Sequence, residues 1–193
     1  MISRFNFPRR GFFIVAGAVL LGIVAGTPSQ AAEPPKFAGL SGDFSPIDPP
    51  LQMPQAGFED KLGDKLSLKD FQGKVVILNF WATWCGPCVL EMPTLDRLQG
   101  KLGGKDLAVV AIALDREGIK KAAPFYRRTG VANLTLYTDR RGSLFEELDG
   151  ANLPTTFILD RDGRVVGKLV GAAAWDSDAA VNLIRHYMDA KAS

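Results

Sequence analysis

Cys85 and Cys88 are the only cysteines of this 193-residue chain, and they stand three positions apart. An apolar run precedes them, Val75–Leu78, which predicts a buried strand. The segment Val89–Leu98 follows them with the apolar spacing of an amphipathic helix. The sequence therefore places both thiols where a strand turns into a helix.

This position favours thiol chemistry. Cysteines three apart at a helix start lie on neighbouring positions of one turn, close enough to bridge. Cys85 faces the unpaired N–H groups and the positive end of the helix dipole, which stabilise a thiolate. In such motifs the thiol pKa falls to roughly 3.5–7.5. Cys88 lies deeper in the turn, which suits a resolving thiol, and Pro87 fits the first turn because it has no N–H to leave unpaired.

Two structural roles for the cysteine pair are less favoured than a redox role. A disulfide that closes a four-residue loop constrains the unfolded chain little, so it stabilises a fold weakly. A zinc site needs four ligands, and the chain has no further cysteine and a single histidine, His186, near its C-terminus. The pair therefore indicates a redox dithiol.

The chain resembles the thioredoxin superfamily, and more narrowly the TlpA/ResA-like thiol-disulfide proteins of bacterial envelopes. The resemblance covers roughly Phe58 to Tyr187. It is carried by the segments Asn79–Cys88 (NFWATWCGPC), Glu91–Pro93, Leu153–Ile158 (LPTTFI) and Asp160–Gly163. A Trp before the cysteines, Gly-Pro between them and a later Leu-Pro-Thr-Thr make the signal far more specific than a lone C-x-x-C.

The resemblance implies an α/β thioredoxin fold, a central mixed β-sheet flanked by helices on both faces, with the inserted strand–helix element of the TlpA/ResA-like group. Hydrophobic patterning agrees with this order. The predicted strands are 65–69, 75–80, 107–114, 134–138, 155–160 and 164–170, and the predicted helices are 85–102, 118–129 and a last one from Ser177. Pro93 predicts a kink in the first helix.

Residues 1–31 are expected to be a signal peptide or an uncleaved membrane anchor. Basic residues precede an apolar stretch at 11–27 that is short for a spanning helix, which needs ~20 residues. Ser29–Ala31 offers a cleavage site, and the pair Arg9-Arg10 resembles a twin-arginine signal. Export to the periplasm or cell envelope follows from either interpretation.

The remaining chain is divided into a linker and one domain. Residues 32–55 are rich in proline and predict an extended linker, and residues 56–193 are expected to form the thioredoxin-like domain. Without residues 1–31 the chain has 20 basic and 21 acidic residues, which gives no argument for nucleic-acid binding. His186 and the pairs Arg127-Arg128 and Arg140-Arg141 are interpreted as solvated surface.

The resemblance also implies a substrate-binding rim around the thiols. Trp84, Gly86 and Pro87 are expected to meet a partner, with core packing as the alternative for Trp84. Pro154 is expected to be cis and to lie against the dithiol. Leu153 is then expected to offer free backbone groups to a substrate strand.

Glu91 is the third expected catalytic residue, beside Cys85 and Cys88. It follows Cys88 by three positions, on the same helix face, and the resemblance assigns it proton handling at the dithiol. The alternative is a solvated surface glutamate. Thioredoxin has a buried Asp where this chain has Asn79, whose amide cannot act as a base.

The function expected from these features is that of a periplasmic protein-disulfide reductase with no cofactor besides the Cys85–Cys88 disulfide. The resemblance implies apocytochrome c or copper-assembly proteins as partners, hence cytochrome c-type biogenesis, and an inner-membrane thiol reductase as electron donor. The alternatives are a disulfide oxidase or isomerase on the same fold, and a copper chaperone that binds through the thiols. A peroxidase is disfavoured because the Pro-x-x-x-Thr-x-x-Cys motif is absent.

Overall fold

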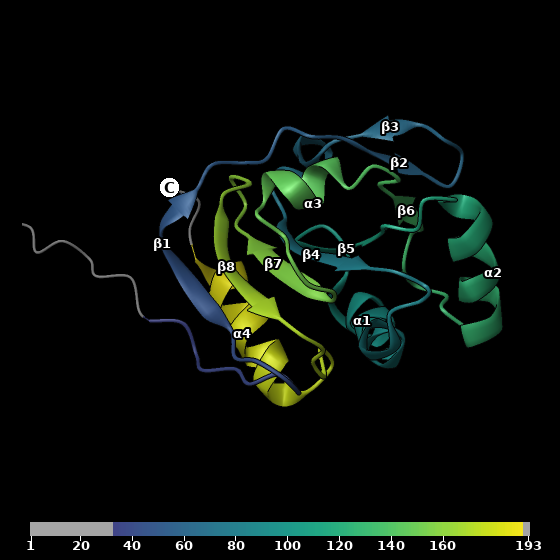
Figure 1. Cartoon of the computed structure of the whole chain (residues 1–193). Helices are drawn as coiled ribbons and strands as arrows, with labels where there is room; N and C mark the ends of the chain where they lie inside the picture. The colour runs from purple at the N-terminus through teal and green to yellow at the C-terminus, as the bar shows by residue number, and fades with distance from the viewer. Residues whose placement is uncertain (1–32, 191–193) are drawn as a thin grey trace, which may run out of the picture. The chain divides into compact units, whose positions relative to one another are not determined.

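The structure, a computed structural model, describes residues 33–190. Its strands are β1 (Ser45–Leu51), β2 (Phe58–Asp60), β3 (Lys65–Leu66), β4 (Val75–Trp81), β5 (Leu107–Ala113), β6 (Tyr137–Thr138), β7 (Thr155–Leu159) and β8 (Val165–Val170). Its helices are α1 (Gly86–Leu102), α2 (Ile119–Thr129), α3 (Ser143–Glu147) and α4 (Asp178–Asp189), with a 3₁₀ turn at Leu68–Phe71. Figure 1 shows their arrangement.

All described strands join one mixed sheet in the order β1-β8-β7-β4-β5-β6-β2-β3. β4 lies at its centre, parallel to β5 and antiparallel to β7. β5 pairs with β4 along its whole length and β7 pairs with Val76–Phe80, and every residue of β4 is buried. The central strand that leads into the cysteines is therefore held on both sides, which fixes the position of the turn after it.

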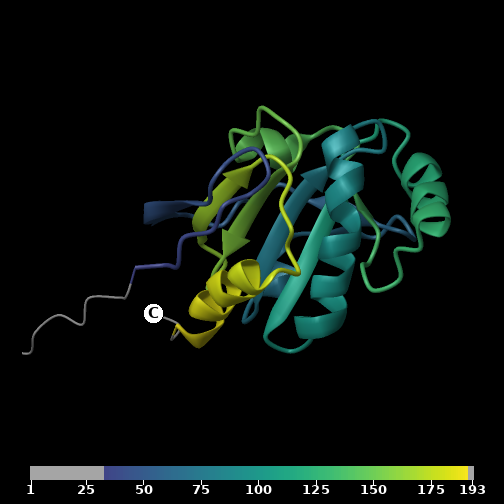
Figure 2. The ribbon, with the colours of Figure 1, turned by 90° about the horizontal axis from the view of Figure 1, so that it is seen from below.

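Side-chain alternation along β4 divides the core into two layers. Val75, Ile77 and Trp81 pack on one face, with α1, α2 and α4. Val76, Leu78 and Phe80 pack on the other face, with α3 and the β2 region. Figures 1 and 2 show α1 and α4 together on one side of the sheet and α3 on the opposite side. Asn79 belongs by alternation to the α1 face, which aims its amide at that helix.

This architecture confirms the predicted fold class, and β6 and α3 extend the chain between α2 and the β7–β8 hairpin. Some boundaries differ from the prediction. The strand expected at 134–138 is hydrogen-bonded in the sheet only at Tyr137–Thr138, and the one expected at 65–69 is β3 followed by the 3₁₀ turn. α1 runs through Pro93 as one continuous helix.

The predicted linker at 32–55 is wrong in its main part. β1 pairs antiparallel with β8 and forms one edge of the sheet. Proline is tolerated in an edge strand because the missing N–H can face the side that has no neighbouring strand. Phe44 packs over Gly167, where any Cβ would clash with its ring. Phe37 packs against Trp175, with ring centroids 5.3 Å apart. The folded domain therefore begins well before residue 56.

The predicted signal peptide or anchor at 1–31 lies outside the described residues. Within residues 33–190, no helix has both the length and the apolar character that crossing a membrane requires.

Candidate active site

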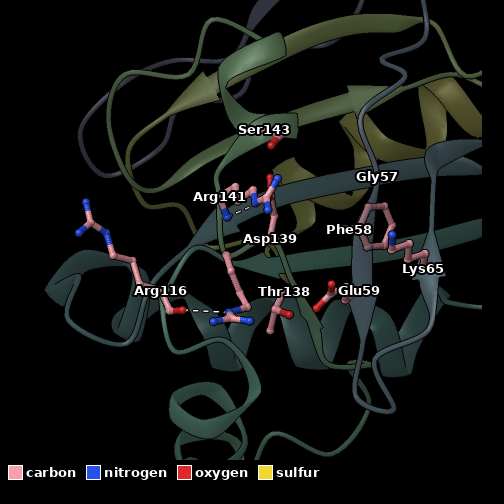
Figure 3. Close-up of a pocket in the computed structure, with 10 residues that line it drawn as sticks. Gly57, Phe58, Glu59, Lys65, Arg116, Thr138, Asp139, Arg141 and Ser143 are labelled. Atoms are coloured by element: carbon pink, nitrogen blue, oxygen red, sulfur yellow. Dashed lines mark hydrogen bonds between the residues drawn. The ribbon is translucent and has the colours of Figure 1, made fainter.

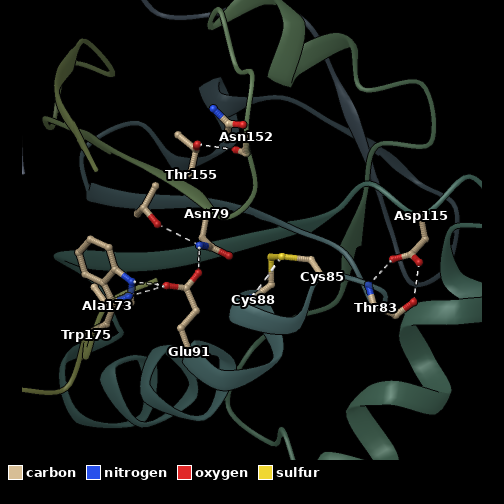
Figure 4. The surroundings of a disulfide bond; sticks show 11 residues. Asn79, Thr83, Cys85, Cys88, Glu91, Asp115, Asn152, Thr155, Ala173 and Trp175 are labelled. Atoms are coloured by element: carbon tan, nitrogen blue, oxygen red, sulfur yellow. Dashed lines mark hydrogen bonds between the residues drawn. A yellow bond between two sulfur atoms is a disulfide. The ribbon is translucent and has the colours of Figure 1, made fainter. Parts of the chain in front are cut away.

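Cys85 and Cys88 form a disulfide at the start of α1, with their Cα atoms 5.3 Å apart (Figure 4). Cys85 is the N-cap of the helix, and its sulfur accepts a hydrogen bond of 3.3 Å from the backbone N–H of Cys88. Pro87 stands in the first turn, as predicted. Cys85 keeps 6% of its surface exposed, whereas Cys88 is fully buried. A partner disulfide therefore reaches the sulfur of Cys85 first.

Glu91 lies one turn after Cys88 and is buried, with 1% of its surface exposed. Its carboxylate accepts hydrogen bonds from Asn79 Nδ2 at 2.8 Å, from the backbone N–H of Ala173 at 3.1 Å and from Trp175 Nε1 at 3.1 Å. Asn79 also donates to Thr156 on β7. Figure 4 shows this network beside the disulfide. The alternative of a solvated surface glutamate is therefore wrong.

Burial raises the pKa of Glu91 from 4.5 to about 7. The hydrogen bonds from Asn79, Ala173 and Trp175 act in the opposite direction, because each donates to the charged form. The pKa that results lies close to neutral pH, where a carboxyl group exchanges protons most readily. The structure thus places a buried carboxyl group with a pKa of about 7 one turn after Cys88, and its role as a proton acceptor stays a prediction.

The loop between β4 and α1 is fixed from the side of β5. Asp115 is buried, and its two carboxylate oxygens accept hydrogen bonds from Thr83: 3.0 Å from the backbone N–H and 2.6 Å from Oγ1. Thr83 stands two positions before Cys85. This pair anchors the loop that carries the thiol, a contact that the sequence analysis did not identify.

A hollow of about 550 Å³ opens beside Cys85. Its lining residues come from the cysteine loop and the start of α1, the position after β5, α3 and the segment before β7: Trp84, Cys85, Pro87, Leu114, Phe145, Ala151, Asn152 and Leu153. Trp84 is 72% exposed, so core packing is excluded for it. The hollow is mostly apolar, and Cys85 is part of its lining.

Only some of the residues predicted to form the substrate-binding rim line this hollow. Trp84, Pro87 and Leu153 line the hollow with Cys85, whereas Gly86 and Pro154 are not part of its lining. The Leu153–Pro154 peptide bond is cis, as the resemblance implies. Among the described residues, neither the backbone N–H nor the C=O of Leu153 has a hydrogen-bond partner. Both groups remain available to an extended chain.

Four lining residues were not identified from the sequence: Leu114, Phe145, Ala151 and Asn152. Phe145 belongs to α3, a helix that was also not predicted. Asp139 holds this helix start by accepting from the backbone N–H groups of Gly142 at 2.9 Å and Leu144 at 2.9 Å. An Asp before Gly-Ser, followed by apolar residues four apart, was the available signal.

The arrangement is suited to thiol–disulfide exchange, with an accessible sulfur, a buried sulfur and a carboxyl group that titrates near neutral pH. Within the described part of the chain, no three His, Cys, Asp or Glu side chains gather into a group that would hold a metal ion.

Three comparisons with known proteins agree with this chemistry. The family model described as Redoxin matches residues 49–184. The thiol-disulfide oxidoreductase ResA of Bacillus cereus is 33% identical over 135 residues, which are 70% of this chain and 77% of that protein. ResA of Bacillus thuringiensis is 38% identical over 112 residues, 58% of this chain and 64% of that protein. A structure from Chlorobium tepidum, described as a candidate thiol:disulfide interchange protein DsbE, is similar with a TM-score of 0.66 and 32% identity, and the match covers 74% of this chain and 99% of that one.

Proposed function

This chain belongs to the Redoxin family and is a thiol-disulfide oxidoreductase, and from that premise we propose that it reduces protein disulfides in the cell envelope. The observation that carries the proposal is the asymmetry of the cysteine pair. Cys85 lies at the start of α1 and keeps some exposure, and Cys88 is fully buried one turn before a carboxyl group whose pKa is about 7. Such an asymmetric pair suits two separate steps: attack on the partner disulfide by one cysteine, and release of the partner by the other.

The attacking thiol is Cys85. In the reduced protein its thiolate attacks one sulfur of a partner disulfide, that S–S bond breaks, and a mixed disulfide forms while the other partner sulfur leaves as a thiolate. The N–H of Cys88 and the start of α1 stabilise negative charge on the Cys85 sulfur. The hollow beside Cys85 receives the apolar part of the partner, and Leu153 pairs with its backbone.

Cys88 resolves the mixed disulfide. Its thiol loses a proton to Glu91, and the thiolate attacks Cys85 Sγ. The partner sulfur leaves as a thiolate, and the Cys85–Cys88 disulfide remains. Two electrons have then moved from the protein to the partner, and a thiol reductase must return them before the next cycle. Two observations support Glu91 as the base: hydrogen bonds hold its carboxylate in position, and burial raises its pKa to about 7.

The direction of electron flow rests on Gly86-Pro87, the dipeptide between the cysteines. Thioredoxin shares this dipeptide and has a potential of about −270 mV, against about −120 mV for the oxidant DsbA. This interval corresponds to ~7 kcal/mol, enough to decide whether a dithiol gives or takes electrons. A disulfide oxidase or isomerase remains the second candidate, because in an oxidising compartment a dithiol that no electron donor reduces stays oxidised.

The partners proposed are apocytochrome c or copper-assembly proteins, with an inner-membrane thiol reductase as the donor. The support for them is the family resemblance together with the exposed, apolar surroundings of Cys85. Residues 1–31 supply the export signal or membrane tether in this proposal.

A trapping experiment tests the function and identifies the partner. Cys88→Ser removes the resolving thiol, so the full chain expressed with this change is expected to accumulate mixed disulfides through Cys85, which mass spectrometry identifies. Cys85→Ser is the matched control and is expected to trap nothing. Trapping by Cys85→Ser instead would reverse the two roles.

The redox potential separates the two directions. Equilibration of the Cys85–Cys88 pair with glutathione is expected to give a value near that of thioredoxin, about −270 mV. A potential above about −150 mV, close to that of DsbA, would exclude the reductase and favour the oxidase.

A further inference from the structure

A second hollow has a volume of about 800 Å³, and several of its lining side chains are basic (Figure 3). Its lining residues are Gly57, Phe58, Glu59, Lys65, Arg116, Thr138, Asp139, Arg140, Arg141 and Ser143. We call it the basic hollow. Neither the cysteines nor Glu91 contributes to it, so the exchange chemistry leaves it unexplained.

The two hollows have no lining residue in common, but two segments of the chain contribute to both of them. Leu114 lines the hollow at Cys85 and Arg116 lines the basic hollow, two positions further along the same loop. Phe145 and Ser143 repeat this relation on α3. The Cα atoms of residues two positions apart are at most ~7 Å from each other, a distance that two or three residues of an extended peptide span.

The charge of the basic hollow is positive on balance. Lys65, Arg116, Arg140 and Arg141 are exposed and face only two lining carboxylates, of Glu59 and Asp139. The carboxylate of Asp139 is already occupied by backbone N–H groups, those of Arg141, Gly142 and Leu144.

The arginines themselves are open to a ligand. Among the described residues, the side chains of Arg116, Arg140 and Arg141 form no ion pair with a carboxylate. Arg140 is oriented by a hydrogen bond of 3.0 Å that its Nε donates to the backbone carbonyl of Arg116. This bond leaves both terminal guanidinium nitrogens free.

We infer that the basic hollow binds an acidic segment of the partner protein, a few residues away from the partner cysteine that reacts with Cys85. This inference rests on the proposed reductase function and adds a substrate class to it: an apolar residue beside the cysteine, and carboxylates further along the chain. Complementary charge at this distance raises the rate of encounter without altering the exchange step.

Peptide substrates test the inference. Each peptide has a single cysteine in a mixed disulfide with glutathione, a leucine beside it, and three Asp, three Asn or three Lys residues placed roughly three to six positions away on either side. The reduced full chain donates two electrons to each peptide, which yields the Cys85–Cys88 disulfide, the peptide thiol and glutathione. The second-order rate constant is measured by stopped flow.

The Asp peptide is expected to react about fivefold faster than the Asn peptide at about 20 mM salt, and the Lys peptide more slowly than both. At about 300 mM salt the advantage is expected to shrink below about twofold, because screening weakens exposed charge pairs. Equal rates for the Asp and Asn peptides at low salt overturn the inference.

The chain offers a matched pair of variants. Arg140→Gln/Arg141→Gln is expected to abolish the Asp-over-Asn ratio. Arg127→Gln/Arg128→Gln removes the same charge from α2, away from the basic hollow, and is expected to preserve the ratio. Loss of the ratio in both variants would assign it to net charge and contradict a site. Because the readout is a ratio within one protein, general damage to a variant does not imitate the result.

Two further outcomes also overturn the inference. If Arg140→Gln/Arg141→Gln keeps the peptide ratio but loses binding to vesicles that contain phosphatidylglycerol, the surface binds lipid. If no peptide of any charge is reduced, the proposed reductase function itself fails. Reduction of the Asn peptide by the wild-type chain reports on that function alone, so the two failures are distinguishable.

Discussion

The two sides of the Cys85–Cys88 disulfide differ in almost every physical property. On the side of Cys88 the surroundings are buried and polar, and Glu91 is held by three hydrogen-bond donors. On the side of Cys85 they are exposed and mostly apolar, with Trp84 at the rim of an open hollow.

This difference indicates a division of labour. A proton acceptor near pH 7 needs burial to raise its pKa and fixed donors to hold its position, and both require a closed interior. Recognition of varied partners needs exposed apolar surface and free backbone groups, which only an open rim supplies. Each prediction below tests one side of the disulfide against the other.

The largest effect is expected from Glu91, on the buried side of the disulfide, in the pH dependence of the free energy of unfolding. Because the pKa of Glu91 is raised to about 7 in the folded protein from 4.5, the folded state binds more protons than the unfolded state between these values. The contribution of Glu91 to stability is therefore complete below pH 4.5 and is lost as the pH rises through about 7. The loss amounts to about 3 kcal/mol in the free energy of unfolding.

Urea unfolding of the oxidised protein at about pH 4.5, 6 and 8 measures this loss, and the disulfide removes any cysteine titration. Glu91→Gln is expected to lack this part of the pH dependence, so the comparison is the wild-type slope minus the variant slope. Identical slopes in the two proteins would mean that Glu91 titrates as an ordinary exposed carboxyl group.

The second prediction compares the two sulfurs directly. In the reduced protein at pH 7, iodoacetamide is expected to label Cys85 about 100-fold faster than Cys88, since Cys85 is accessible at the helix start and Cys88 is fully buried. Mass spectrometry of the digested protein at successive times gives both rates. Equal rates, or faster labelling of Cys88, would contradict the asymmetry on which the proposed function rests.

How far the sequence predicts these two sides depends on how local their causes are. The strand β4, the start of α1 and the positions of Cys85 and Cys88 follow from local patterning and helix-terminus physics. The burial of Glu91 does not, because it depends on Ala173 and Trp175, which lie about 80 positions further along the chain. Only the family resemblance pointed to it.

The open side was less predictable still. α3 is one short helix of five residues, stabilised by Asp139 at its start and by Phe145, whose ring lies 5.0 Å from that of Phe80. β1 is an edge strand whose prolines obscure any alternation, and its pairing with β8 is distant in sequence. Both elements owe their existence to tertiary contacts rather than to local propensity.

The two arginine pairs illustrate the same limit. Arg127-Arg128 and Arg140-Arg141 are alike as sequence, and both were interpreted as solvated surface. In the structure only Arg140 and Arg141 line the basic hollow. The distinction arises from the fold, which brings the end of β6 beside β2.

The third prediction concerns Glu91 as a base. Glu91→Gln keeps the size of the side chain but cannot accept the proton of Cys88. We expect release of the partner from the mixed disulfide to slow about tenfold, less than the usual effect of a general base, because a small thiolate fraction of Cys88 still reacts. The wild-type rate is expected to rise as the pH passes through about 7, where Glu91 loses its proton.

A pH–rate series of single-turnover release from pH 5 to 9 measures both proteins. The variant is expected to lose the rise near pH 7 and to keep the later rise that belongs to the thiol itself. Since the two groups titrate as a coupled pair, the comparison is between whole profiles and not between fitted constants. Superimposable profiles would leave Glu91 with a structural role only.

The smallest effect is expected on the open side, at Trp84. Its ring is 72% exposed and lines the hollow at Cys85, so Trp84→Ser removes apolar contact area for a partner and almost none from the core. We expect KM for a disulfide peptide to rise about threefold to fivefold, which corresponds to ~0.7–1 kcal/mol of binding, with kcat unchanged.

Leu90 provides the control, because it is equally exposed at 72% on α1 but does not line the hollow. Leu90→Ser is expected to leave KM at the wild-type value, and neither change is expected to alter the unfolding free energy by more than ~0.5 kcal/mol. An equal rise of KM in both variants would show that any exposed apolar side chain near the cysteines contributes to partner binding. The hollow would then not be a specific binding site for the partner. A fall in kcat for Trp84→Ser alone would move Trp84 from the open, recognising side of the disulfide into the exchange step itself.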